Sequence, residues 1–107
     1  MDLDRLNDKE TAVYEALKKV IDPELGVSLI DLGLIYDIKV DKENICKINW
    51  TLTTMGCPII EVLTKMIEDA AIGIDGIKKC QTKLVYYPPW TPKMMSRQAR
   101  MILRIHL

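Results

Sequence analysis

The residue best suited to chemistry in this sequence is Cys57, which stands between Gly56 and Pro58. Proline is favoured at the first position of a helix, and glycine permits a sharp turn out of a strand. The Cys57 sulfur is therefore expected at or beside a helix N-cap, where the helix dipole and free N–H groups stabilise a thiolate. Such a thiol can act as a nucleophile, as a metal ligand or as a buried cap.

The remaining cysteines and the one histidine narrow these alternatives. Cys46 and Cys80 fall on the apolar faces of predicted strands, where free cysteine usually serves packing. His106 lies at the chain end, so it is a weak candidate for the base that a cysteine nucleophile needs. The widely spaced cysteines include no CxxC pair, which argues against a disulfide framework and against a closed zinc site.

A second group of reactive side chains lies in the acidic stretch 22–34. Asp22 precedes a proline, as in many turns, and Ser28 with Asp31 has the spacing of a capping box. Local chemistry alone allows Asp22, Ser28 and Asp31 simply to bind backbone N–H groups. Glu24 does not fit a capping position and, on the same basis, is interpreted as a solvated loop carboxylate.

Apolar periodicity predicts six elements to position these groups. A helix from Asn7 or Asp8 to Val20 is followed by a hairpin of two strands. A helix after Cys57, a third strand and a last helix complete the order α-β-β-α-β-α. The predicted ranges are 32–40 and 45–53 for the hairpin strands, 58–72 for the second helix, 77–87 for the third strand and 93–103 for the last helix.

Alternation assigns faces within these elements. The first strand should place its even-numbered residues from Leu32 to Val40 on one face and Gly33, Ile35, Asp37 and Lys39 on the other. Thr51 and Thr53 should lie on the polar face of the second strand. The last helix should bury Met95, Ala99, Ile102 and Leu103. Its other side has a basic stripe, read either as a solvated face or as a docking surface for an acidic partner: Lys93, Arg97, Arg100 and Arg104.

These elements predict an α/β domain of the two-layer α+β type, with a small three-stranded mixed sheet covered by helices. The β-α-β connection should be right-handed, which makes the third strand parallel to the second. Because the sheet has free edges and one bare face, we expect a homodimer.

Composition places the chain in a broad class. With 107 residues, we expect one domain spanning residues 1–107. The 15 basic and 15 acidic residues balance, so global charge favours neither nucleic acid nor an anionic membrane as partner. No apolar run is long enough to span a bilayer, and the first residues do not resemble a signal peptide. We therefore expect a soluble, cytoplasmic protein.

Six motifs then occur in one order along the chain: Asp22-Pro23-Glu24-Leu25-Gly26, Asp31-Leu32-Gly33-Leu34, Thr51-Leu52-Thr53-Thr54, Gly56-Cys57-Pro58, Pro88-Pro89-Trp90-Thr91-Pro92 and Met94-Met95-Ser96. Together they closely resemble the SufT/PaaD-type family of metal–sulfur cluster biosynthesis proteins, from about Thr11 to Leu103. The resemblance implies an iron–sulfur-assembly-type domain that matures iron–sulfur proteins by cluster assembly or transfer, without enzymatic turnover. It places the family's signature cysteine at Cys57, its acidic residues at Asp22, Glu24 and Asp31, and its threonines at Thr51 and Thr53.

Ligand chemistry limits what this resemblance allows. A thiolate binds soft iron, but a cluster normally needs about four protein ligands and Cys57 offers one per chain. Nothing should therefore be bound tightly, and a transient cluster or iron would need ligands from a dimer or from a partner. The expected partners are the assembly machinery and client apoproteins. The alternatives are a metal-free interaction adaptor in the same pathway and, less favoured, a thiol-dependent enzyme.

Overall fold

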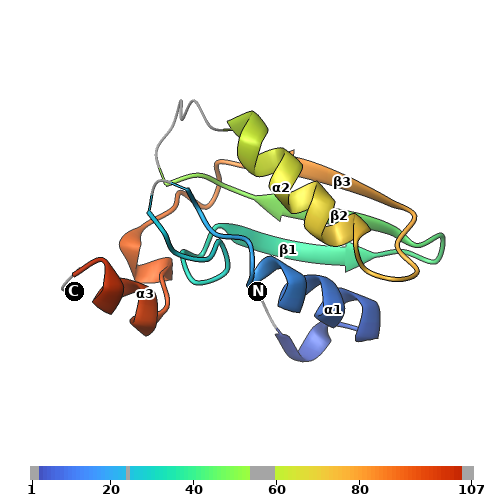
Figure 1. Cartoon of the computed structure of the whole chain (residues 1–107), viewed down its shortest axis with the longest axis horizontal. Coiled ribbons are helices and arrows are strands. Elements are labelled where there is room, and N and C mark those ends of the chain that lie inside the picture. Colours follow the sequence, from blue (N-terminus) through green and yellow to red (C-terminus); the bar gives the residue numbers. More distant parts are fainter. Residues whose placement is uncertain (1–2, 24, 54–59, 105–107) are drawn as a thin grey trace.

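The computed structural model describes residues 3–23, 25–53 and 60–104. The elements follow the predicted order α-β-β-α-β-α, with two short 3-10 helices added, η1 and η2 (Figure 1). In chain order they are η1 (Leu3–Arg5), α1 (Asp8–Leu17), β1 (Ile35–Val40), β2 (Ile45–Trp50), α2 (Ile60–Ile72), β3 (Lys79–Leu84), η2 (Pro92–Met94) and α3 (Arg97–Ile102).

The three strands form one mixed sheet with β2 in the centre. β1 pairs with β2 in antiparallel fashion, with Ile38 opposite Ile48, and β3 pairs with β2 in parallel, with Cys80 opposite Cys46. Both α1 and α2 lie on one side of this sheet, and α3 lies beyond the end where β1 begins (Figure 1). The predicted α+β fold with a mixed sheet is thereby confirmed.

The hydrophobic core fills the space between the sheet and the two long helices. β2 contributes Cys46, Ile48 and Trp50, which alternate along the strand as predicted and are almost completely buried. The side chains that meet them from the helices are Val13 and Leu17 of α1 and Leu63, Ile67 and Ala71 of α2. The central strand is therefore buried on this side along its whole length, and this burial supplies most of the stabilisation of the fold.

Helix α1 is joined to the sheet by a buried carboxylate. Asn7 caps the helix, and Glu10 completes a capping box by accepting the Asn7 N–H at 2.9 Å. The other oxygen of Glu10 accepts the Val40 N–H of β1 at 2.8 Å. Glu10 is only 9% exposed, so both bonds are largely shielded from water. One side chain thus fixes both the start of α1 and the outer edge of β1.

Replacing Glu10 with alanine is expected to cost about 2–3 kcal/mol of unfolding free energy, because two N–H groups lose their acceptor. Glutamine keeps one acceptor oxygen, so Glu10→Gln should cost about half as much. Urea denaturation followed by tryptophan fluorescence measures both. The matched control is Glu15→Ala on the exposed side of α1, which should stay within about 0.5 kcal/mol of the parent. Equal costs for Glu10→Ala and Glu15→Ala would contradict this role.

The first strand is shorter than predicted and its faces differ. Residues 29–33 form turns in place of the predicted strand start at Leu32, and Gly33 adopts a positive φ of 76°. The register then shifts between Ile35 and Asp37, so Tyr36 is an extra residue in the strand. Because of this bulge, Ile35 lies in the core, where it is 6% exposed, and not on the face that it was predicted to share with Asp37 and Lys39.

The predicted last helix is interrupted. Pro92–Met94 forms η2, Met95 is extended, and α3 begins only after Ser96, whose Oγ accepts the Ala99 N–H at 3.0 Å. Met95 and Ala99 are buried as predicted, but Ile102 is 57% exposed, so its predicted burial is wrong. Lys93 lies in η2, so the basic stripe does not follow one continuous helix.

Other boundaries differ by a few residues. α1 ends at Leu17, three residues before its predicted end, and β2 ends at Trp50. β3 runs from Lys79 to Leu84, inside the predicted 77–87. The predicted start of the second helix at Pro58 lies outside the described residues. No helix in the described ranges has the length and apolar character needed to cross a membrane.

Candidate functional site

Asp22 is a structural residue of the acidic stretch. Its Oδ1 accepts the Leu25 N–H at 3.1 Å, and its backbone carbonyl accepts the Gly26 N–H at 2.8 Å. Its side chain is buried, with 5% exposed. The interpretation of Asp22 as a group that binds backbone donors is therefore confirmed.

Ser28 also holds the loop together. Its Oγ accepts the Ile30 N–H at 3.1 Å, two residues further on, while its backbone bridges to Ile21. This bond makes a serine turn and not the capping box suggested by its spacing from Asp31. Ser28 binds a backbone donor as expected, but through a different local structure.

Asp31 differs from these two residues. Its backbone carbonyl accepts the Ser96 N–H at 2.7 Å, which ties the loop to the start of α3. Its side chain is half-buried, and no described residue donates a hydrogen bond to its carboxylate or forms an ion pair with it. Asp31 is therefore a carboxylate held in place through its backbone, with neither oxygen engaged by a residue that the structure describes.

The end of β2 presents the two threonines in different environments. The Thr51 N–H donates to the Leu34 carbonyl at 2.8 Å, and its side chain is only 2% exposed. Thr53 is exposed. The two threonines, which were predicted together on the polar face of the strand, therefore differ in exposure. Thr51 lines a small hollow together with Tyr86, Pro89 and Trp90 from the segment that follows β3.

Trp90 links the threonines to the acidic stretch. Its Nε1–H donates to the Leu32 carbonyl at 2.8 Å. The same ring lines a hollow of about 130 Å³ together with Thr51, Thr53, Tyr86 and Pro89. In the sequence, Pro88-Pro89-Trp90-Thr91-Pro92 is one of the six motifs of the family resemblance, and no contact was predicted for Trp90. The feature of the sequence that could have predicted this hydrogen bond is the tryptophan itself, because a partly buried tryptophan needs an acceptor for its N–H.

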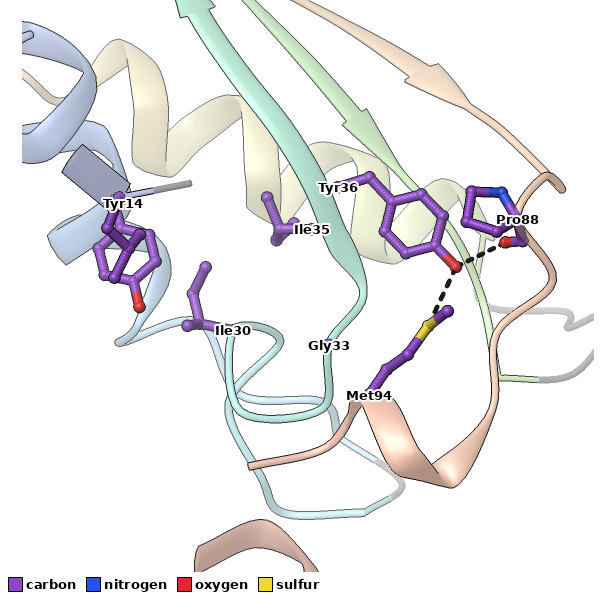
Figure 2. A pocket seen from close by; sticks show the side chains of 8 residues that line it. Tyr14, Ile30, Gly33, Ile35, Tyr36, Pro88 and Met94 are labelled. Carbon is purple, nitrogen blue, oxygen red and sulfur yellow. Dashed lines mark hydrogen bonds between the residues drawn. The ribbon is translucent and has the colours of Figure 1, made fainter. Parts of the chain in front are cut away.

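Tyr36, the extra residue of the bulge, also contacts the segment that contains Trp90 (Figure 2). Its hydroxyl donates to the Pro88 carbonyl at 2.8 Å and lies 3.4 Å from the Met94 Sδ. Burial raises the pKa of the Tyr36 hydroxyl, and a hydrogen bond with the Thr51 side chain partly offsets this rise. The tyrosine therefore stays protonated and keeps its donor role at neutral pH.

Figure 2 also shows the hollow beside this contact, which lies between Tyr14 of α1 and Tyr36 of β1. It measures about 520 Å³ and has a largely apolar lining that includes Ile30, Ile35 and Met94. Gly33 forms part of its wall because its backbone lies directly against Met94. No pattern in the sequence predicted this hollow.

Cys46 and Cys80 face each other across β2 and β3 and are both buried. The hydrogen bond between the two thiols and their burial raise the pKa of Cys46 above its ordinary range. A buried thiol with a raised pKa carries little thiolate. The prediction that these two cysteines serve packing is consistent with their burial in the core.

Cys57 and Glu24 lie outside the described residues. Within residues 3–23, 25–53 and 60–104, no group of three or more histidine, cysteine or acidic side chains is placed to hold a metal ion. What the described chain does bring together, at the end of β2 that leads to Cys57, is Thr51, Thr53, Trp90 and the backbone of the Asp31–Leu34 stretch.

Comparison with known proteins gives this arrangement its context. A family model described as iron–sulfur cluster assembly protein matches residues 10–84. The chain is 40% identical over 93 residues to the Fe–S protein maturation auxiliary factor YitW of Bacillus subtilis, covering 87% of this chain and 91% of that one. It is 41% identical over 86 residues to the Fe–S protein maturation auxiliary factor SufT of Staphylococcus aureus, covering 80% and 98%.

A solved structure agrees with these sequence matches. The crystal structure of a domain of unknown function, DUF59, from Bacillus anthracis superposes with a TM-score of 0.86 at 34% identity. The superposition covers 92% of this chain and 93% of that one. The match of the family model over most of the sequence, together with these relatives, shows that the chain belongs to the iron–sulfur cluster assembly protein family.

Proposed function

We propose that this protein is a maturation factor for iron–sulfur proteins, which assembles clusters or transfers them to client apoproteins through Cys57. The observation that carries the proposal is the family membership, together with relatives of nearly the same length that are named as Fe–S protein maturation auxiliary factors. Its partners are the assembly machinery and its clients, and it acts in the cytoplasm as a single domain without enzymatic turnover.

Cys57 is proposed as the thiolate ligand for iron, with Glu24 and Asp31 as nearby oxygen ligands or as carboxylates that bind a basic residue of the client. Support for Asp31 comes from its carboxylate, which no described residue engages. Asp22 is proposed to shape the acidic loop, because its Oδ1 already binds the Leu25 N–H. Thr51 and Thr53 precede Cys57 on the same strand end and are proposed to orient the turn.

The cluster or iron in this proposal is cargo held transiently. One thiolate per chain is too few for a closed site, since clusters normally take about four protein ligands. A homodimer would bring a second Cys57 to the site, and a client would bring its own cysteines. In either case the protein releases the cargo readily, which is what transfer to another protein requires.

The test is iron and sulfide analysis of protein purified without oxygen. Because the cargo is held transiently, we expect less than one iron per chain in the parent, and loss of this iron in Cys57→Ser, since a serine hydroxyl does not ionise to replace a thiolate. The matched control is Cys80→Ala, which removes a buried thiol and should retain the iron. Glu24→Gln and Asp31→Asn, measured in the same way, show which carboxylate contributes to binding.

A metal-free adaptor in the same pathway is the second candidate. The observation that favours it is the exposed surface at and just after α3, where Met101 is 70% exposed and Arg97 and Arg104 are also exposed. In that case the parent would contain no iron under the same conditions, and Cys57→Ser would leave client binding unchanged. The iron content of the parent thus separates the two functions.

A further inference from the structure

The two outer edges of the sheet differ in how their backbone groups are satisfied. On the free side of β1, the Val40 N–H donates to Glu10 at 2.8 Å and the Ile38 N–H donates to the Asp37 carboxylate at 3.0 Å. Carboxylates therefore occupy the places where another strand would bind. This edge is closed to further strand pairing.

The edge of β3 is open. The Val85 N–H donates to the Trp50 carbonyl of β2 at 2.8 Å, so the odd-numbered residues of β3 direct their backbone groups toward β2. The N–H and carbonyl groups of Cys80, Thr82 and Leu84 consequently point outward. No strand lies on that side, and no side chain of the described chain binds these groups. The open edge is about 20 Å long at the usual rise per residue.

On the face of the sheet that no helix covers, the charged side chains of β3 are all basic. Lys79 and Lys83 are exposed there, and neither forms an ion pair with a described residue. All 15 acidic residues of the chain lie between Asp2 and Asp75, so the sequence after position 75 has no carboxylate side chain. The basic residues of this part are Lys78, Lys79, Lys83, Lys93, Arg97, Arg100 and Arg104.

The helix-covered side of the same edge has a different character. Thr82 and Leu84 are half-buried there, and Glu68 of α2 interacts electrostatically with Cys80. A strand added to β3 would present alternate side chains to the two faces. It would therefore match best with acidic residues toward Lys79 and Lys83 and apolar residues toward Thr82 and Leu84.

A second copy of β3 fits this edge poorly. Antiparallel pairing of two β3 strands about Gln81 would place Lys79 of one copy opposite Lys83 of the other. Like charges directly opposite each other destabilise a strand pair, and lysines on an edge strand prevent self-pairing. In this register the charges select against a copy of the chain and in favour of an acidic segment.

We propose that the outer edge of β3 binds an extended segment of another protein that alternates acidic and apolar residues, and that this segment joins the sheet as a fourth strand. Backbone hydrogen bonds to Cys80, Thr82 and Leu84 provide affinity, and Lys79 and Lys83 provide selectivity. The inference does not depend on iron or on Cys57, so it stands or falls separately from the proposed function.

The test uses synthetic peptides of about seven residues, long enough to span the strand, titrated into the full chain and followed by NMR amide shifts and hydrogen exchange. The first peptide alternates glutamate and valine. A second replaces glutamate with lysine, and a third is the first with N-methyl groups on the amides that would face β3. We expect the first to slow exchange at Cys80, Thr82 and Leu84 about tenfold at saturation, and the other two to have no effect.

Charge reversal provides the matched variant. The double substitution Lys79→Glu and Lys83→Glu should lower the affinity for the glutamate peptide about tenfold. It should also allow the lysine peptide to bind. Both positions are exposed, so folding is expected to be retained. Equal binding by the N-methylated peptide, or unchanged affinity in the charge-reversed variant, overturns the proposal. Protection of these amides that rises with protein concentration and without peptide also overturns it, since a second copy would then be the occupant.

Discussion

Cells that contain only the Cys57→Ser variant are expected to fail in maturing iron–sulfur clients, to the level of cells that lack the protein. The reason is that the proposed transfer uses a thiolate, and serine provides no comparable ligand for iron. The measurement is the activity of an iron–sulfur client enzyme, normalised to the amount of its polypeptide. This is the largest functional effect that we expect from any single substitution.

Two controls keep this result interpretable. The melting temperature of purified Cys57→Ser should match that of the parent, which excludes loss of folding as the cause. Cys80→Ala, which removes a thiol at the β2–β3 contact, should support client maturation once its stability has been checked. Normal client activity with Cys57→Ser would show that Cys57 is not the working group.

The largest effect on stability is expected from Gly33→Ala, which should cost about 3 kcal/mol or more. Gly33 has a φ of 76°, which is unfavourable for a residue with a Cβ. A Cβ at this position would lie 2.4 Å from the Met94 carbonyl oxygen and 2.8 Å from its carbon. Since these neighbours are backbone atoms, relief requires the whole segment around η2 to move.

Gly26→Ala is the matched control for this substitution. Gly26 has a similar φ of 70°, but a Cβ there would meet no atom within 4 Å. Gly26→Ala should therefore cost only the free energy of holding an alanine at a positive φ, about 1 kcal/mol. Urea denaturation of both variants gives the difference, which isolates the contact with Met94. If the two substitutions cost the same, close packing of Gly33 against η2 is not a source of stability.

The parts of the fold that could be predicted from sequence are those determined by local patterns. The alternation of Cys46, Ile48 and Trp50 predicts the central strand and its buried face, and Asn7 is a favoured capping residue. Both features depend on residues within a few positions of one another. The parallel pairing of β3 with β2 was predicted from the helix that connects the two strands, and it is confirmed.

The parts that could not be predicted depend on contacts between distant residues. The bulge at Tyr36 places the tyrosine hydroxyl against Pro88, and the break in the predicted last helix allows the Ser96 N–H to reach the Asp31 carbonyl. Neither partner can be identified from the pattern around the other. The burial of Thr51 could not be predicted either, because its polar position on the strand gives no sign of the hollow that it lines with the segment after β3.

The contacts that join the segment around Trp90 to the rest of the chain also determine when the site can form. Trp90 reaches back 58 residues to Leu32, and Tyr36 reaches forward 52 residues to Pro88. During synthesis the chain emerges from its N-terminus, so the acidic loop and the end of β2 are exposed long before these partners exist. The helices and the β1–β2 hairpin can form early, because their contacts are local. The surroundings of the site can be completed only near the end of translation, and a chain truncated before Pro88 would contain all three strands but lack the Trp90 segment that joins the end of β2 to the acidic loop.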